Sequence, residues 1–139
     1  MKLLLDEQLD VQLKSLLSGI EVYTPRDLGW LGLQNGELRR NINEKGFQFF
    51  VTADKNFPFQ QNFSKINFTI LLFDTPSMRW RHQQLFISPI QKFLDNLPSQ
   101  LPKLVHISIV GISLGKKRDA LQKRLPPDDV LFLEFPSEK

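Results

Sequence analysis

The sequence contains no cysteine among its 139 residues. Disulfide bonds and thiolate metal sites are therefore excluded, and a reducing compartment suits the chain. Long apolar runs are missing as well. Residues 1–5 reach acidic residues after three leucines, too early for the core of a signal peptide, and no later run approaches a membrane span. We therefore expect a cytoplasmic protein with no membrane association.

Two further patterns are missing. No glycine-rich loop of the kind that cradles phosphates is present, and the two histidines lack the helical spacing of a zinc site. The composition itself is ordinary, with 41% hydrophobic and 24% charged residues, as in globular domains. At 139 residues the chain fits a single domain that can bury a core without covalent links.

The net charge is +3, and the basic excess is unevenly distributed. The first 60 residues carry eight acids and seven Lys or Arg, whereas the remainder carries seven acids and eleven Lys or Arg. A basic surface beside an acidic site would suit a polyanion such as RNA. Solubility alone is the simpler explanation for an excess this small.

Continuous apolar runs, which predict strands, alternate with amphipathic segments, which predict helices. Strands are expected at 2–5, 20–24, 47–51, 68–73 and 104–112, with an added edge strand at 130–135. Helices are expected at 9–17, 35–45 and 83–97, and a short turn or helix begins at 56 or 57. This alternation predicts an α/β fold with a mostly parallel sheet of about five strands, flanked by helices and buried on both faces.

Acidic residues follow several of these strands. Asp6 and Glu7 end the first strand, Asp54 follows the third, and Asp74 follows the fourth. Glu37 lies in the first turn of the helix after the second strand. Because binding crevices of parallel sheets lie at the carboxyl ends of the strands, these acids are expected to converge. Gathered carboxylates repel one another, and Mg²⁺ or Mn²⁺ relieves that repulsion while activating water.

Each acid also has an ordinary structural interpretation. Asp6 could be the N-cap of the first helix, Asp54 a turn or cap residue, and Glu37 a first-turn acid that complements the helix dipole. Asn35 is interpreted first as an N-cap. Taken singly, these interpretations carry about even weight, because caps are common.

Three motifs together resemble the PIN-like proteins: MKLLLDE at 1–7, GWLGLQNGEL at 29–38, and FFVTADKNF followed by FQQNF within 49–63. The chain is most similar to small bacterial PIN-like domains of unknown function that are often associated with toxin–antitoxin pairs. The resemblance covers about residues 1–110. It implies a PIN-like three-layer domain over 1–112, and we expect 113–139 to be a C-terminal extension of the same domain, with a basic stretch and the edge strand.

The resemblance implies an activity and a set of residues. PIN nucleases bind Mg²⁺ or Mn²⁺ through acidic residues and cut single-stranded RNA with metal-activated water. By position, Asp6, Glu37 and Asp54 match the catalytic, metal-binding acids. The implied partners are RNA and a cognate antitoxin protein, and a homodimer stays open. Two departures weaken the match: Asn35 stands where many PIN domains have an aspartate, and Arg39 stands where a leucine is expected.

Other residues are assigned supporting roles. Glu7, Asn35, Thr52 and Asp74 are expected behind the metal-binding acids, and Asp74 is also the candidate for a fourth acid. The residues expected to contact RNA are Arg26, Arg39, Arg40, Lys55 and Trp80. Helix packing is the preferred interpretation of Trp80, and the basic run 116–118 is interpreted as a solvated surface.

Two rival functions remain open. Phospho-receiver domains use the same order of residues, with Asp6 and Glu7 as the acid pair, Asp54 as phospho-acceptor, Thr75 and Lys116. Lys116 lies several residues past its strand, however, and that scheme has no use for Glu37. The third hypothesis is a catalytically inactive PIN-like domain that binds a partner.

Overall fold

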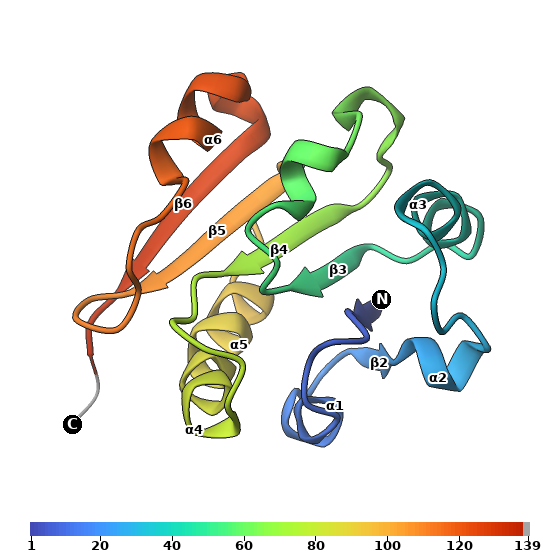
Figure 1. Cartoon of the computed structure of the whole chain (residues 1–139), viewed down its shortest axis with the longest axis horizontal. Coiled ribbons are helices and arrows are strands. Elements are labelled where there is room, and N and C mark those ends of the chain that lie inside the picture. The colour runs from blue at the N-terminus through green and yellow to red at the C-terminus, as the bar shows by residue number, and fades with distance from the viewer. Residues whose placement is uncertain (138–139) are drawn as a thin grey trace.

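The computed structural model describes residues 1–137. Six strands form one sheet in the order β2–β1–β3–β4–β5–β6, and every neighbouring pair is parallel (Figure 1). The strands are β1 Lys2–Leu5, β2 Glu21–Tyr23, β3 Phe49–Thr52, β4 Thr69–Phe73, β5 Leu104–Ile109 and β6 Val130–Phe135. The predicted α/β class is confirmed, with six strands in place of about five and only parallel pairs in the described sheet.

Helices cover both faces of this sheet. The α-helices are α1 Gln12–Leu16, α2 Pro25–Leu28, α3 Asn35–Glu44, α4 Trp80–Gln83, α5 Ile87–Asp95 and α6 Arg118–Arg124. Short 3₁₀ helices are η1 Phe57–Gln60, η2 Phe63–Lys65, η3 Gln84–Phe86 and η4 Pro127–Asp129. No helix within residues 1–137 is long and apolar enough to cross a membrane.

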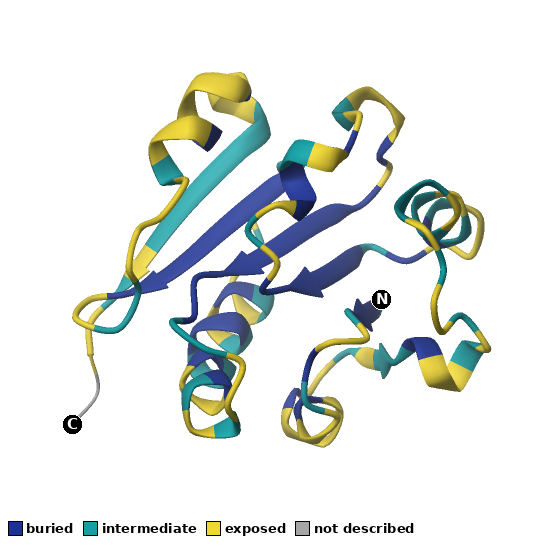
Figure 2. Ribbon diagram, in the orientation of Figure 1, coloured by how far each residue is buried: buried dark blue, intermediate teal, exposed yellow. Residues whose placement is uncertain are grey.

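The core lies in two layers, one on each face of the sheet. Because side chains alternate along a strand, Leu3 and Leu5 pack on the face of α1 and α5, whereas Leu4 packs on the face of α3 and α6. β3 and β4 divide their side chains in the same way. Figure 2 shows these central strands buried throughout, as the continuous apolar runs predict.

The strand order reverses between β1 and β3. The chain runs outward from β1 to β2, returns across β1 through α2 and α3 to β3, and then moves steadily away to β6. A parallel sheet has its binding crevice at such a switch point, beyond the carboxyl ends of the strands. Here Leu5 pairs with Val51, so Asp6 and Asp54 leave the sheet side by side.

One crossover differs from the others. The connections β2–β3, β3–β4 and β5–β6 all move the same way along the sheet and pass over the α3 face. The connection β4–β5 also moves that way but passes over the opposite face, through α4 and α5. Its hand is therefore opposite to theirs, which is uncommon among parallel strands. A doubly wound sheet of order 2-1-3-4-5 with uniform crossovers, the arrangement of phospho-receivers, would place this helix on the α3 face.

Several predicted boundaries are corrected. The helix expected at 83–97 begins at Trp80 and passes through η3 before α5, because Pro89 has no N–H to continue the hydrogen-bond ladder back to Leu85. The strand expected to reach residue 112 ends at Ile109, whose N–H donates to Ser113 Oγ (2.9 Å) in a turn through Gly111. The predicted first helix is reduced to the five residues of α1.

The cap interpretations of Asn35 and Asp6 are wrong. Gln34 is the N-cap of α3 and Asn35 is its first residue, so the Asn35 side chain is free for a contact elsewhere. α1 starts at Gln12, too far along the chain for Asp6 to cap it. Glu37 does lie in the first turn of α3, as predicted.

Candidate functional site

A pocket of about 450 Å³ opens at the switch point between β1 and β3. Its polar lining comes from the ends of both strands and from the first turn of α3, and apolar side chains close its other sides. The lining residues are Asp6, Glu7, Gln8, Leu33, Asn35, Leu38, Ala53, Asp54, Lys55, Phe57 and Met78. The structure therefore brings five of the predicted polar residues into one cavity: Asp6, Glu7, Asn35, Asp54 and Lys55.

Thr52, the last residue of β3, links the two aspartates. The Thr52 hydroxyl donates to Asp6 Oδ2 (2.7 Å). The hydroxyl oxygen of Thr52 also accepts the backbone N–H of Asp54 (3.0 Å). Asp54 Oδ1 in turn accepts the N–H of Asn56 (2.9 Å), which forms a tight turn at the pocket rim. Thr52 is fully buried, so its hydroxyl fixes the carboxylate of Asp6 and the backbone of Asp54 from beneath the pocket.

The charge of Asp6 is destabilised by its surroundings. Burial is the largest cause that raises the pKa of Asp6 above its ordinary value, and the neighbouring charge of Asp54 raises it further. The hydrogen bonds from Thr52 and from the backbone of Gln8 and Glu7 lower the pKa and offset only part of this. A partly buried carboxylate beside a second carboxylate is a place where a cation would be stabilised.

Two other lining residues are held by contacts across the pocket wall. Glu7 Oε1 accepts the N–H of Gly32 (3.2 Å), and Asn35 Nδ2 donates to Gln60 Oε1 (2.7 Å). Both side chains carry oxygen atoms, which hard divalent cations prefer. The Asn35 contact also joins α3 to η1, which forms part of the opposite wall.

Glu37 does not belong to this lining. Its side chain is exposed on α3, although Asn35 and Leu38 beside it line the cavity. Within residues 1–137 no group of three or more His, Cys or acidic side chains stands close enough to hold a metal ion. The structure thus brings Asp6 and Asp54 together and leaves Glu37 outside.

The arginines predicted to contact RNA are spread around the pocket. Arg26 lines a separate hollow of about 120 Å³, which also includes Asp6 and Glu7 and lies on the β2 side of them. Arg39 and Arg40 lie on α3 and do not line the pocket. Trp80 is half-buried and packs against the core on the α1 face, in agreement with the helix-packing interpretation.

Asp74 is in a different environment from the acids of the pocket. It is fully buried after β4, where its Oδ2 accepts the N–H of Gly115 (2.9 Å) and its Oδ1 lies 3.4 Å from Lys55 Nζ. Lys55 Nζ also donates to the carbonyl of Thr75 (3.0 Å). Asp74 therefore anchors the lysine of the pocket and is not itself part of the pocket lining.

His106 lies beside Asp74 in the interior. Its Nε2 is 3.8 Å from Asp74 Oδ2, and its Nδ1 is buried without a hydrogen-bond partner. Burial is the main cause that lowers the pKa of His106 below 6.5, although the charge of Asp74 opposes this shift. The imidazole is therefore neutral at pH 7, and it packs against the ring of Phe132 (centroids 5.5 Å apart).

The receiver residues do not assemble around Asp54. The hydroxyl of Thr75 donates to the carbonyl of Ser77 (2.7 Å), and Lys116 is exposed on the loop after β5. The neighbouring Lys117 contacts the turn that follows Asp54, since its Nζ donates to Asn56 Oδ1, two residues after Asp54. Together with the position of α5, this arrangement does not support the receiver hypothesis.

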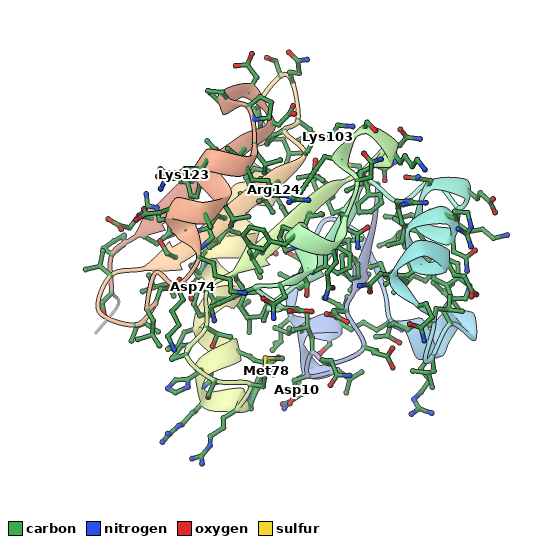
Figure 3. All side chains as sticks on the ribbon, turned by 45° about the horizontal axis from the view of Figure 1, so that its top comes forward. Asp10, Asp74, Met78, Lys103, Lys123 and Arg124 are labelled. Carbon is green, nitrogen blue, oxygen red and sulfur yellow. The ribbon has the colours of Figure 1, made fainter. Side chains whose placement is uncertain are left out.

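Two features of the site were not predicted from the sequence. Met78 lines the pocket, and its carbonyl accepts from Gln83 Nε2 (2.6 Å), while Gln83 Oε1 accepts the N–H of Asp10 (2.9 Å). Asp10 and Met78 lie close to each other in Figure 3. Nothing in the sequence marks Met78.

The second feature is the contact of Lys117 with Asn56. The only sequence signal for it is the basic run 116–118, whose simplest interpretation is a solvated surface.

Comparisons with known proteins found no protein family, no curated protein and no solved structure that matches this chain. The PIN-like resemblance therefore rests on the sequence motifs. Fold and pocket together define a class: a parallel α/β domain with paired carboxylates at its switch point.

Proposed function

We propose that the protein is a metal-dependent ribonuclease that cuts single-stranded RNA, with the pocket between β1 and β3 as its active site. The observation that carries the proposal is the pair Asp6 and Asp54, joined through Thr52 in a polar cavity at the switch point. RNA as substrate, an antitoxin as partner and a toxin role follow from the PIN-like resemblance, whereas the cytoplasmic location is the expectation from composition.

The residues present fit a magnesium or manganese ion. Mg²⁺ is commonly bound by one or two carboxylates together with waters and a substrate phosphate, and Asp6 and Asp54 supply that number. Burial and the neighbouring charge of Asp54 raise the pKa of Asp6, so its ionised form would be stabilised by a cation. When bound, the ion supplies that charge and makes its water more acidic.

The other polar residues have roles in holding the substrate. Lys55 places an ammonium group at the pocket, where the carbonyl of Thr75 takes only one of its three donor directions. It can therefore donate to a phosphate oxygen while Asp74 holds it in place. Glu7 and Asn35 complete the oxygen-rich wall, and Leu33, Leu38 and Met78 form apolar parts of the lining.

Glu37 is the third acid that the resemblance implies. Because its carboxylate is exposed beside the pocket, we assign it the outer position, where it would hold a water of the metal ion. Its neutral variant Glu37→Gln is expected to lose less activity than a variant of Asp6 or Asp54.

An RNA cleavage assay tests the proposal. The wild-type protein should cut an unstructured RNA with Mn²⁺ and should stop when a chelator is added. Asp54→Asn should lower the rate by about 100-fold or more, because it removes one charge that holds the ion, while its circular dichroism spectrum is unchanged. Asp128→Asn, an exposed acid on η4, is the matched control and should retain full activity.

Undiminished cleavage by Asp54→Asn would refute the assignment of this pocket. If the wild-type protein bound Mn²⁺ and RNA but never cleaved, the domain would be an inactive PIN-like binding domain. Labelling of Asp54 by acetyl phosphate would favour the receiver instead.

A further inference from the structure

The loop after β5 and helix α6 lie against η1, the short helix that follows Asp54. Lys117, which precedes α6, donates from its Nζ to Asn56 Oδ1, and the N–H of Asn56 donates to Asp54 Oδ1 (2.9 Å). An ammonium group from the C-terminal part of the chain is therefore fixed at the rim of the acidic pocket.

The backbone at Lys117 makes this position unusual. Lys117 has φ +65°, the left-handed conformation that glycine adopts without steric cost, and no other non-glycine residue in the described chain has a positive φ. A lysine thus occupies a position that favours glycine, and its side chain points to the pocket rim.

A second cation, Arg124, also contacts η1. Arg124, near the end of α6, donates to the carbonyl of Phe59 (3.3 Å), and its guanidinium lies 5.6 Å from the centre of the Phe59 ring. Lys117 Nζ lies 5.5 Å from the same ring. In Figure 3, Arg124 lies on the side of α6 that faces the η1 segment. Phe59 is half-exposed, so an aromatic ring stands between two cations along η1.

Beyond η1 the surface is hollowed again. A cavity of about 510 Å³ is lined by Arg124, by Gln61 and Asn62 of the η1–η2 connection, and by Ser64 of η2. One acid, Asp129, also borders it. The acidic pocket reaches Phe57 at the start of η1, so η1 connects the two hollows.

We infer that this strip, defined by Asn56, Phe59, Lys117 and Arg124, binds the single-stranded RNA that enters the acidic pocket and guides it along η1 to the second hollow. Surfaces for single strands combine cations that follow the backbone with aromatic rings, and the strip has both. The inference deepens the proposed function and rests on it for the identity of the ligand. It moves the RNA contacts away from Arg39, Arg40 and Trp80 to a segment outside the PIN-like match.

The neighbouring cation Arg118 is excluded from the strip. Its guanidinium lies 3.7 Å from the carboxylate of Glu134 on β6, so its charge already has an acidic partner. Arg79 and Arg81 lie at α4, on the opposite face of the sheet, and are exposed. They supply a control with the same change of charge.

The experiment measures RNA binding without cleavage. A fluorescein-labelled oligouridylate of about 12 nucleotides, within the usual site sizes, is titrated with full-length protein in EDTA at several salt concentrations. Lys117→Gly/Arg124→Gln removes two charges, and glycine suits the backbone at 117. This variant should bind about tenfold more weakly and show a salt slope lower by about 1.4, for two lost phosphate contacts. Arg79→Gln/Arg81→Gln should stay within about threefold of wild type.

Equal losses in the two double variants would overturn the inference, because net charge alone would explain them. Binding of polyglutamate but not of oligouridylate would also overturn it, in favour of an acidic protein partner. The binding result is independent of catalysis. The expected binding pattern, together with no cleavage by the wild-type protein in the separate Mn²⁺ assay, supports the strip and refutes the nuclease. If Lys117→Gly/Arg124→Gln cleaves RNA at the wild-type rate and binds it with wild-type affinity, the nuclease is supported and the strip is refuted.

Discussion

Two aspartates follow neighbouring strands of the sheet and end in opposite environments. Asp54, after β3, is exposed at the rim of the switch-point pocket, where its carboxylate faces Asp6. Asp74, after β4, has no exposed surface and is held by the N–H of Gly115 and by Lys55. In the sequence, the two acids carry the same signal.

The difference arises from strand order. The chain reverses its direction across the sheet between β1 and β3, so the connections diverge there and leave a cavity. Between β4 and β5 no reversal occurs, and the loop after β5 folds over the strand ends, with Ser113 Oγ donating to the carbonyl of Asp74 (2.6 Å). An acid at a switch point is available for chemistry, whereas an acid at a covered strand end becomes part of the structure.

The largest effect expected from this comparison is on stability. Asp74→Ala should lower the free energy of unfolding by about 2–4 kcal/mol, because it leaves the N–H of Gly115 and the ammonium of Lys55 without their buried partner. Asp54→Ala should stay within about 1 kcal/mol, since the residue is exposed. Urea denaturation monitored by tryptophan fluorescence measures both. Equal losses of unfolding free energy in the two variants would show that Asp54 and Asp74 contribute equally to stability, contrary to the difference expected from their environments.

The buried histidine beside Asp74 gives a pH-dependent effect. Because the pKa of His106 is lowered in the folded protein, the unfolded chain binds the extra proton as pH falls below 6.5. The unfolding free energy should therefore decrease with falling pH, with a contribution from His106 of at most about 1.4 kcal/mol per pH unit. Urea denaturation between pH 7 and 5 should show a shallower pH dependence for His106→Gln. An unchanged slope would indicate that His106 is charged in the fold.

The smallest expected effect concerns Asp6. Its pKa is raised in the folded protein, so ionisation costs stability as pH rises from 3.8 through the folded pKa. Asp6→Asn should therefore be slightly more stable than wild type at pH 7, by less than about 1 kcal/mol, the scale of partly exposed charge pairs. The gain should disappear below pH 3.8. Thermal unfolding at pH 7 and pH 3 measures it, and a variant that is less stable at pH 7 would contradict the proposed repulsion.

Much of the fold follows from the sequence, because β-branched and apolar runs bounded by Gly, Pro and Asp mark strands locally. The six strands match the predicted runs, and Val130–Phe135 is the predicted edge strand. Pro89 was a local signal for the 3₁₀ segment that precedes α5. The helical spacing of apolar residues from Gln83 onward nevertheless predicted one continuous helix. The hand of the β4–β5 crossover has no local signal and could not be predicted.

The site was predicted only in part, for a related reason. Asp6 and Asp54 follow strands that pair directly, so their proximity is a consequence of parallel strands alone. The partners of Asp74 come from Gly115 and Lys55, and the rim cation comes from Lys117, some sixty residues after Asn56. Such contacts depend on how distant loops fold over the sheet, which the pattern of residue types does not specify.

Binding of Mn²⁺, followed by the loss of its free-ion electron paramagnetic resonance signal, tests the central claim most directly. The claim is that the switch-point carboxylates, and not Asp74, hold a divalent cation. Wild-type protein and Asp74→Asn should bind Mn²⁺ with affinities within about threefold of each other, and Asp6→Asn and Asp54→Asn should each lose more than about tenfold. Equal binding by all four proteins, or a loss confined to Asp74→Asn, would contradict the account.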